Sequence, residues 1–301
     1  MKNKMALFSK IVFVFFCIST NIQAQSLGNL FSNNVKRLTI KPSETDDKIK
    51  AFDLPHLILY DQSIKQGKLF LFLPGTNGVA ENGPSELFKT AIEQGYRVIC
   101  LSYINNPAVS NICIQENLQN DCECAEKFRI KRIYGENVST LITDEPQDAI
   151  INRFTKLLLY LVQNDKAGNW DYYLENGNPR WNKIVISGQS QGGGMSAFIA
   201  KKVLVDKIIT FSGGWDYSAN NEIAKWYYKK SITPPERWYG VYNVEEPASL
   251  IIAETYKALG IPKNHIYPLS LKNTNWKKAH VYGVKNVANK KIWIKMLGKG
   301  N

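Results

Sequence analysis

The sequence predicts an α/β fold in which helices cover both faces of a mostly parallel central sheet. From residue 55 onward, short apolar runs rich in β-branched residues alternate with segments of helical periodicity. This alternation is typical of parallel strands joined by crossover helices. One of these runs begins at Lys183 and continues through a glycine-rich turn into a helix, as expected for a strand near the middle of such a sheet.

The elements of this fold follow one another along the chain. Strands at 56–60 and 68–73 precede a helix at 84–94 and a strand at 96–103. The next helix begins after Asp144, which we expect to cap it, and places an apolar i, i+3, i+4 stripe on the sheet. The remaining elements are the strand that begins at 183, a helix to about 203, strands at 207–211 and 238–242, a helix at 248–259, a strand at 266–271 and a terminal helix at 290–297.

Two segments interrupt the alternation. Residues 105–141 are polar, contain cysteines and show no sustained period, so they predict an insertion on the surface. Residues 213–236 carry several tryptophans and tyrosines among polar residues and end in Pro234-Pro235. These aromatic side chains are expected either to roof a pocket or to pack against the sheet.

The first 24 residues predict an export signal. Three lysines precede an apolar run at 11–18 that is too short to span a bilayer, and Ala24 offers a cleavage boundary. Residues 25–301 are then a single domain, secreted or periplasmic, without a stable membrane anchor. Loss of the three lysines lowers the formal charge from +12 to +9, and the remaining lysines are scattered, so nucleic acid is not an expected partner.

Four cysteines remain after the predicted cleavage. Cys100 lies on a predicted strand, whereas Cys113, Cys122 and Cys124 share one polar segment. In an oxidising compartment we expect a bridge within 113–124 or one from Cys100 to that segment, and the connectivity is left open. Since no histidine accompanies the cluster, a metal site is not expected, and no other motif indicates a cofactor.

The most specific motif is Gly188-Gln-Ser-Gln-Gly192 between a predicted strand and a predicted helix. A serine on such a sharp turn is the nucleophile elbow of a serine hydrolase. The flanking glycines fit this interpretation, because a Cβ atom there would clash with neighbouring backbone. Ser190 is therefore the predicted nucleophile.

A serine hydroxyl needs an imidazole to accept its proton. Only three histidines are available. His56 lies on an early strand, and His265 precedes the last strand, at the end of the sheet away from the elbow. His280 lies in the predicted loop beyond that last strand, at the same edge as Ser190, so elimination favours His280 as the base.

The acid that orients this imidazole is expected between the serine and the histidine in chain order. Glu245 and Glu246 follow the strand at 238–242. We favour Glu245, because Glu246 is equally explained as a charge in the first turn of the following helix. Asp216, which follows the strand at 207–211, is the rival.

Two backbone amides are expected to stabilise an oxyanion. The Gln191 N–H, directly after the serine, is one donor. The second is expected in Pro74-Gly-Thr-Asn-Gly78, where two glycines let the backbone turn, and Thr76 N–H is the predicted donor.

Over roughly residues 55–297 the chain resembles the α/β-hydrolase superfamily. The elbow, the loop 74–78 and the order serine, acid, histidine carry the resemblance. It implies a parallel sheet of the eight-strand type, a covalent acyl-enzyme and hydrolysis of that intermediate. The sequence departs from the family where Pro74 replaces the usual histidine and where glutamate replaces the commoner aspartate.

The expected function is that of an exported esterase acting on a small-molecule or polysaccharide ester, with a carbohydrate or lipid ester as substrate. A peptidase or amidase on the same fold is the alternative within enzymes. A catalytically inactive binding protein that keeps the fold is the alternative outside them.

Overall fold

The computed structural model describes residues 30–113, 121, 123–218 and 222–300. The predicted export signal and Cys122 lie outside the described residues. The described residues from Asn33 onward form one compact unit. All strands and helices of the described residues belong to this unit.

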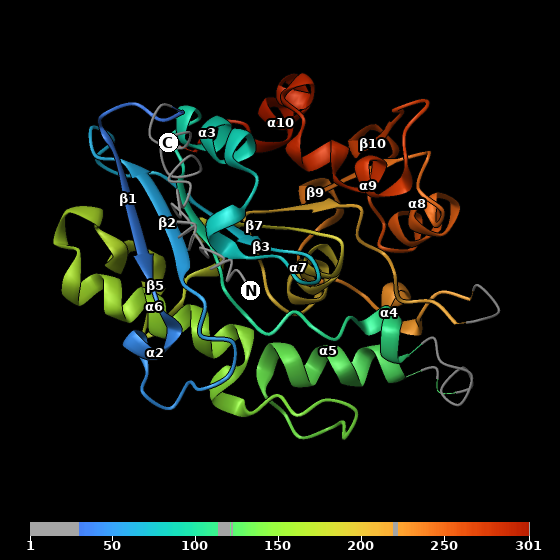
Figure 1. Cartoon of the computed structure of the whole chain (residues 1–301), viewed down its shortest axis with the longest axis horizontal. Coiled ribbons are helices and arrows are strands. Elements are labelled where there is room, and N and C mark those ends of the chain that lie inside the picture. The colour runs from blue at the N-terminus through green and yellow to red at the C-terminus, as the bar shows by residue number, and fades with distance from the viewer. Residues whose placement is uncertain (1–29, 114–120, 122, 219–221, 301) are drawn as a thin grey trace, which may run out of the picture. The chain divides into compact units, whose positions relative to one another are not determined.

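An eight-stranded sheet in the order β1-β2-β4-β3-β7-β8-β9-β10 forms the centre of this unit (Figure 1). β2 runs antiparallel to both of its neighbours, and the other pairs are parallel. The expected mostly parallel sheet is therefore confirmed. Its strands are β1 (Val35–Ile40), β2 (His56–Asp61), β3 (Leu69–Leu73), β4 (Arg97–Cys100), β7 (Ile184–Gln189), β8 (Lys207–Phe211), β9 (Trp238–Asn243) and β10 (Ile266–Leu269).

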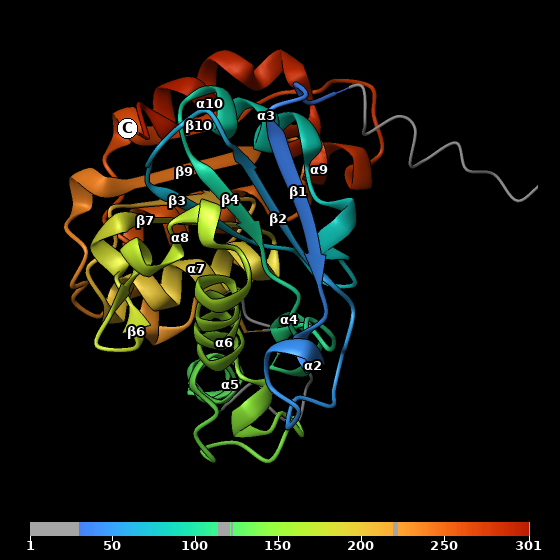
Figure 2. The ribbon, with the colours of Figure 1, turned by 90° about the vertical axis from the view of Figure 1, so that its left-hand side faces the viewer.

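Helices lie on both faces of the sheet. α3 (Ser85–Glu93), α9 (Trp276–Lys285) and α10 (Lys290–Leu297) contact one another on one face, as Figure 2 shows. α6 (Ile150–Asn164) and α7 (Gln191–Lys202) lie on the other face. The remaining α-helices and strands are α2 (Pro42–Thr45), α4 (Val109–Ile112), α5 (Cys124–Tyr134), α8 (Ser249–Ala258) and a short hairpin of β5 (Leu174–Glu175) and β6 (Asn178–Pro179).

The core lies around the two central strands. Every residue of β3 is buried, and so is β7 up to its last residue. A strand covered on both faces needs apolar residues on both sides, which explains the unbroken run Leu-Phe-Leu-Phe-Leu in β3. The edge strand β1 was not expected from the sequence, because only Ile40 in it is buried.

The expectation that 105–141 is a surface insertion is wrong. α5 lies within it and packs on α6 and α7, with Phe128 and Ile133 fully buried. Its inward face also carries Arg129 and Arg132, each only 1% exposed and paired with an aspartate. Arginine counts as polar in a hydrophobicity pattern. Because two of the buried positions of α5 are arginines, its apolar residues show no clear helical periodicity in the sequence.

The expected cap at Asp144 is also wrong. α6 begins at Ile150, after a 3₁₀ turn over Pro146–Asp148, and Ala149 is the residue at its N-cap. Asp144 is buried instead against Arg132, whose guanidinium donates two hydrogen bonds to its carboxylate. A charge partner twelve residues away therefore determined the position of this side chain.

One disulfide joins Cys113 to Cys124, within the segment where a bridge was expected. It links the end of α4 to the first residue of α5. Cys100 is buried in β4 and forms no disulfide with a described cysteine, so the alternative pairing of Cys100 with this segment is wrong for Cys113 and Cys124.

Candidate active site

Ser190 lies on a strained turn between β7 and α7. Its backbone has φ 55° and ψ −121°, a conformation that residues with a side chain rarely adopt. The turn is held because Ser190 N–H donates to Phe211 O at 2.8 Å and Gly194 N–H donates to Ser190 O at 3.1 Å. The structure therefore presents this serine on a strand-to-helix elbow.

The two glycines of the motif are sterically required. A Cβ atom on Gly188 would lie 2.4 Å from the backbone of Gly192, and one on Gly192 would lie 2.0 Å from Leu73 O. Backbone atoms cannot move aside as the end of a side chain can. Glycine at 188 lets β7 lie close to the start of α7, and glycine at 192 lets the elbow approach the end of β3.

Thr76 and Gln191 lie around one cavity with Ser190. Gln191 is the first residue of α7, so its N–H has no acceptor within the helix. Asn77 N–H donates to Asn105 Oδ1 and Gly78 N–H to Gly75 O, whereas Thr76 N–H donates to no group among the described residues. Thr76, Ser190 and Gln191 line one cavity.

Asn105, which the sequence did not single out, holds the loop 74–78. Besides accepting from Asn77 N–H, it donates from Nδ2 to Gly78 O at 2.7 Å. Its own carbonyl accepts from Gln191 Nε2 at 2.6 Å, and Gln191 Oε1 accepts from Val109 N–H. The side chain after the serine thus ties the elbow to the loop that presents Thr76.

Glu246, and not the favoured Glu245, contacts the histidine. His280 Nδ1 lies 2.5 Å from Glu246 Oε2, and Glu246 Oε1 accepts from Ser212 Oγ and Asn243 N–H. Glu245 is exposed, and the one hydrogen bond that its carboxylate accepts from the described residues comes from Ser270 Oγ, at 3.3 Å. Two consecutive residues point in different directions, and the bonds to Ser212 and Asn243 turn the second one inward.

Asp216 does not contact the histidine among the described residues. Its carboxylate accepts two hydrogen bonds from Arg129, both at 2.5 Å, and one from Trp226 Nε1. Both side chains of the ion pair are almost fully buried. The burial of the Arg129 guanidinium needs this carboxylate, which gives Asp216 a different partner from the one considered.

His280 lies on a helix, so its expected place in a loop is wrong. It is in α9, whose N-terminus is capped by Asn275 Oδ1 accepting from Lys278 N–H. Because a carboxylate only accepts hydrogen bonds, the proton in the bond to Glu246 belongs to His280 Nδ1. A neutral ring then keeps Nε2 as its acceptor.

Two neighbours of Ser190 contact His280. Gln189, directly before the serine, donates from Nε2 to His280 O at 3.5 Å. Trp215 lines the cavity of Ser190, and its ring stands perpendicular to the His280 ring with centroids 5.4 Å apart. Among the described residues Ser190 and His280 form no hydrogen bond with each other, and contacts of this kind often tighten only with substrate.

Trp215 is the second residue of the candidate site, after Asn105, that the sequence analysis did not identify. Its indole Nε1 donates to Ser212 O at 2.7 Å, while Ser212 Oγ donates to Glu246. One residue at the end of β8 thus anchors both the carboxylate and the ring beside the imidazole. The signal was the run Ser212-Gly-Gly-Trp215, which follows a strand at the edge where the elbow lies.

Two cavities adjoin Thr76. The first, here the Ser190 cavity, has an open volume of about 220 Å³ and is lined by Thr76, Val109, Arg129, Ser190 and Trp215 among others. The second, the Lys285 cavity, has about 600 Å³ and is lined by Thr76, Asn82, Gln189, Val284 and Lys285 among others. A substrate centred near Thr76 therefore has space in two directions.

No cluster of three or more histidine, cysteine or acidic side chains suited to a metal ion occurs in the described part of the chain. Within the same residues, no helix combines the length and the apolar character needed to cross a membrane.

No known family profile matches the chain, and no curated protein sequence matches it either. Solved structures do. Esterase B from Lactobacillus rhamnosis, determined with a tributyrin phosphonate, has a TM-score of 0.51 at 10% identity, with 91% of this chain and 89% of that one covered. A putative dienelactone hydrolase from Klebsiella pneumoniae has a TM-score of 0.48 at 12% identity, covering 88% and 98%. At these identities the likeness concerns the fold.

The strand order, the crossover helices on both faces and the structural likeness to esterase B agree with one another. The chain has the α/β-hydrolase fold.

Proposed function

We propose that this protein is a serine hydrolase that cleaves carboxylic esters. The observation that carries the proposal is the hydrogen bond between Glu246 and His280 next to a serine held on an elbow. The carboxylate fixes the tautomer that leaves His280 Nε2 free to accept the serine proton. Thr76 and Gln191 line the same cavity, and in the described part of the chain no acceptor is recorded for either backbone amide.

In the first half-reaction, Ser190 Oγ attacks the ester carbonyl carbon while its proton passes to His280 Nε2. The electron pair of the carbonyl moves to oxygen, and the Thr76 and Gln191 amides stabilise this oxyanion. Each such donor contributes roughly 3 kcal/mol to the stability of the transition state. When the carbonyl re-forms, the bond to the alcohol breaks, and the alcohol takes the proton from His280.

In the second half-reaction, water attacks the acyl-enzyme. His280 Nε2 accepts one proton of the water, and the oxyanion forms and collapses as before. The bond to Ser190 breaks, Oγ regains its proton from His280, and the acid leaves. Glu246 stays ionised throughout and stabilises the imidazolium that forms twice in each turnover.

A fluorophosphonate probe tests the proposal directly. Such a probe reacts with an activated serine, so we expect labelling of the wild-type chain at Ser190 and none of Ser190→Ala. We also expect p-nitrophenyl ester hydrolysis to fall at least 10³-fold in Ser190→Ala. Mass spectrometry of the labelled peptide and steady-state kinetics provide the measurements.

The same experiment separates the alternatives. Peptide anilides cleaved faster than p-nitrophenyl esters would make the protein an amidase or peptidase. No labelling of the folded wild-type chain between pH 5 and pH 9 would contradict an enzyme of this class and favour a binding protein.

We also propose that residues 1–24 are an export signal and that the mature protein is secreted or periplasmic. The Cys113–Cys124 disulfide supports this, because such bonds persist in oxidising compartments. N-terminal sequencing of protein recovered from an exporting host would show Gln25 first. Recovery of an intact Met1 in the cytosolic fraction would contradict the proposal.

A further inference from the structure

We infer that the Ser190 cavity holds the acyl part of the substrate and selects short acyl groups that carry an uncharged oxygen. The inference rests on the proposed function, because it assigns the two sides of an ester bond to two cavities. Three observations carry it: the place of His280, the size of the cavity and an unpaired donor on Arg129.

The place of His280 determines which cavity takes which half of the ester. The leaving alcohol takes its proton from His280 Nε2, so the alcohol departs toward the helix that carries the histidine. Val281, Val284 and Lys285 of that helix line the Lys285 cavity. The Ser190 cavity is reached from the same Thr76 but contains no residue of α9. It is therefore the place for the acyl group.

The size of the Ser190 cavity limits the acyl group. Its open volume of about 220 Å³ is much smaller than the roughly 600 Å³ of the Lys285 cavity. Ala108, Val109 and Trp215 line it, and the first two are almost fully buried. The smaller space therefore suits a short acyl chain.

Arg129 is the cationic residue among the described residues that line the Ser190 cavity. The side chain is 1% exposed, and its Nε and Nη2 are both used on Asp216. Nη1 is buried and has no hydrogen-bond partner among the described residues. A buried guanidinium nitrogen without an acceptor is costly, so an oxygen atom of a bound molecule would repay part of that cost.

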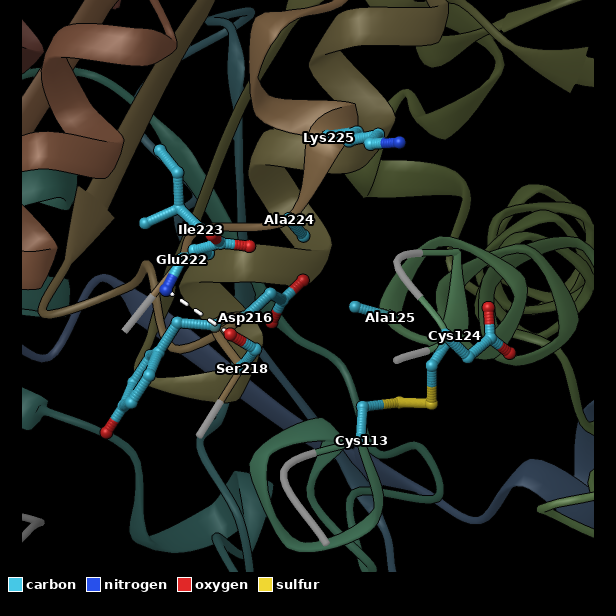
Figure 3. Close-up of a pocket in the computed structure, with 11 residues that line it drawn as sticks. Cys113, Cys124, Ala125, Asp216, Ser218, Glu222, Ile223, Ala224 and Lys225 are labelled. Carbon is cyan, nitrogen blue, oxygen red and sulfur yellow. Dashed lines mark hydrogen bonds between the residues drawn. A yellow bond between two sulfur atoms is a disulfide. The ribbon is translucent and has the colours of Figure 1, made fainter. Parts of the chain in front are cut away.

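The charge of this part of the cavity favours an uncharged oxygen. Asp216 also lines the Ser190 cavity and neutralises Arg129, so no net positive charge is available to attract a carboxylate. The same aspartate lines a further cavity beside the Cys113–Cys124 disulfide, with about 490 Å³ of open volume (Figure 3). An ether, keto or hydroxyl oxygen accepts from Nη1 without placing a second anion near Asp216.

An isosteric pair of substrates tests the donor. p-Nitrophenyl butyrate and p-nitrophenyl methoxyacetate have acyl chains of the same length and differ by one CH₂ replaced by oxygen. We expect Arg129→Lys, which keeps the charge beside Asp216 but lacks the second donor branch, to lower kcat/KM for methoxyacetate at least tenfold more than for butyrate. Comparing each substrate between wild type and variant cancels its intrinsic reactivity.

Arg132→Lys is the matched control. Arg132 lies three residues along the same helix, is equally buried and is paired with Asp144, but it does not line the Ser190 cavity. We expect its effect on the two substrates to agree within twofold. If Arg129→Lys lowered both substrates by the same factor, the donor assignment would be overturned.

Chain length tests the cavity independently of Arg129. We expect the wild type to hydrolyse acetate and butyrate at least tenfold better, in kcat/KM, than octanoate. Val109→Ala removes two methyl groups from the wall, and the hydrogen bond from its backbone N–H to Gln191 is retained. It should raise the octanoate-to-acetate ratio at least fivefold.

Equal hydrolysis of octanoate and acetate by the wild type would overturn the acyl assignment and leave the proposed function intact. Absence of Ser190-dependent hydrolysis for every ester would overturn the proposed function and this inference with it. The chain-length result stands even if Arg129→Lys does not fold, which a thermal melt of each variant establishes.

Discussion

At the scale of single residues, the direction of a side chain and its hydrogen-bond partners determine its role more than its residue type does. Glu245 and Glu246 are chemically identical neighbours, yet one is exposed and the other has hydrogen bonds from Ser212, Asn243 and His280. The sequence predicted an acid here, but it favoured Glu245, which is not the glutamate that contacts His280. The choice depends on a hydroxyl 34 residues away, whose position only the folded sheet determines.

The two glutamates differ in their expected effect on activity. Glu246→Gln should lower kcat for a good ester substrate by about 10³- to 10⁴-fold, because the amide no longer stabilises the imidazolium or fixes its tautomer. Glu245→Gln, its neighbour and control, should change kcat less than twofold. Steady-state kinetics of both variants check this, and equal losses would contradict the assignment.

His56 makes stability depend on pH. It is fully buried, its Nδ1 accepts from Ser102 N–H, and burial lowers its pKa to about 3. An unfolded histidine has a pKa near 6.5, so between about pH 6.5 and pH 3 the unfolded chain binds the additional proton. This contribution to the free energy of unfolding is complete above pH 6.5 and is lost as the pH falls.

Because of His56, we expect the free energy of unfolding to fall by about 2 kcal/mol when the pH is lowered from 7 to 4.5. In His56→Asn the amide oxygen accepts the same hydrogen bond but does not titrate. Urea unfolding at both pH values measures the free energy of unfolding of each protein. The difference between the two pH values should be smaller in the variant than in the wild type by that amount. Parallel curves for variant and wild type would refute a neutral buried His56.

At the scale of elements, local rules predicted the elbow and failed for α5. The elbow is encoded within nine residues, since two glycines, a serine and a preceding apolar run suffice to specify it. α5 depends on distant carboxylates, because Arg129 and Arg132 are buried only where Asp216 and Asp144 meet them. Arg129 and Asp216 are 87 residues apart, so their ion pair cannot be detected from the local periodicity of the sequence.

The close approach of the elbow to β3 gives a direct stability test. Gly192→Ala would place Cβ 2.0 Å from Leu73 O, so we expect it to lower the free energy of unfolding by at least about 3 kcal/mol. Gly177→Ala is the control, because nothing lies within 4 Å of its Cβ and only its φ of +76° opposes the change, at about 1 kcal/mol. Similar losses in urea unfolding would contradict the steric explanation.

At the scale of the whole molecule, the sheet and its crossover helices were predictable because they repeat one pattern along the chain. The first strand, β1, and the pairing of the cysteines could not be predicted from the sequence. β1 has a single buried residue, so its hydrophobic pattern is too weak to detect. The disulfide joins α4 to α5, two elements that the composition of their segment concealed.

The disulfide should contribute measurably to stability. It closes a short loop, with its cysteines 11 positions apart, which corresponds to about 2 to 3 kcal/mol in the chain-entropy account. The double variant Cys113→Ser with Cys124→Ser should therefore melt about 4 to 10 °C lower than wild type. A reductant should shift the wild type by a similar amount and leave the variant unchanged, and an effect of reductant on the variant would point to another bridge.

Of the residues that the structure describes, Thr76 is the one that lines both the Ser190 cavity and the Lys285 cavity. This has a practical consequence for inhibitor design. A phosphonate or boronate warhead centred at that amide would present two arms that grow in separate directions and meet different walls. Because modifications far apart contribute almost additively to binding, each arm could be optimised alone and the best halves then joined. Their gains in potency should multiply.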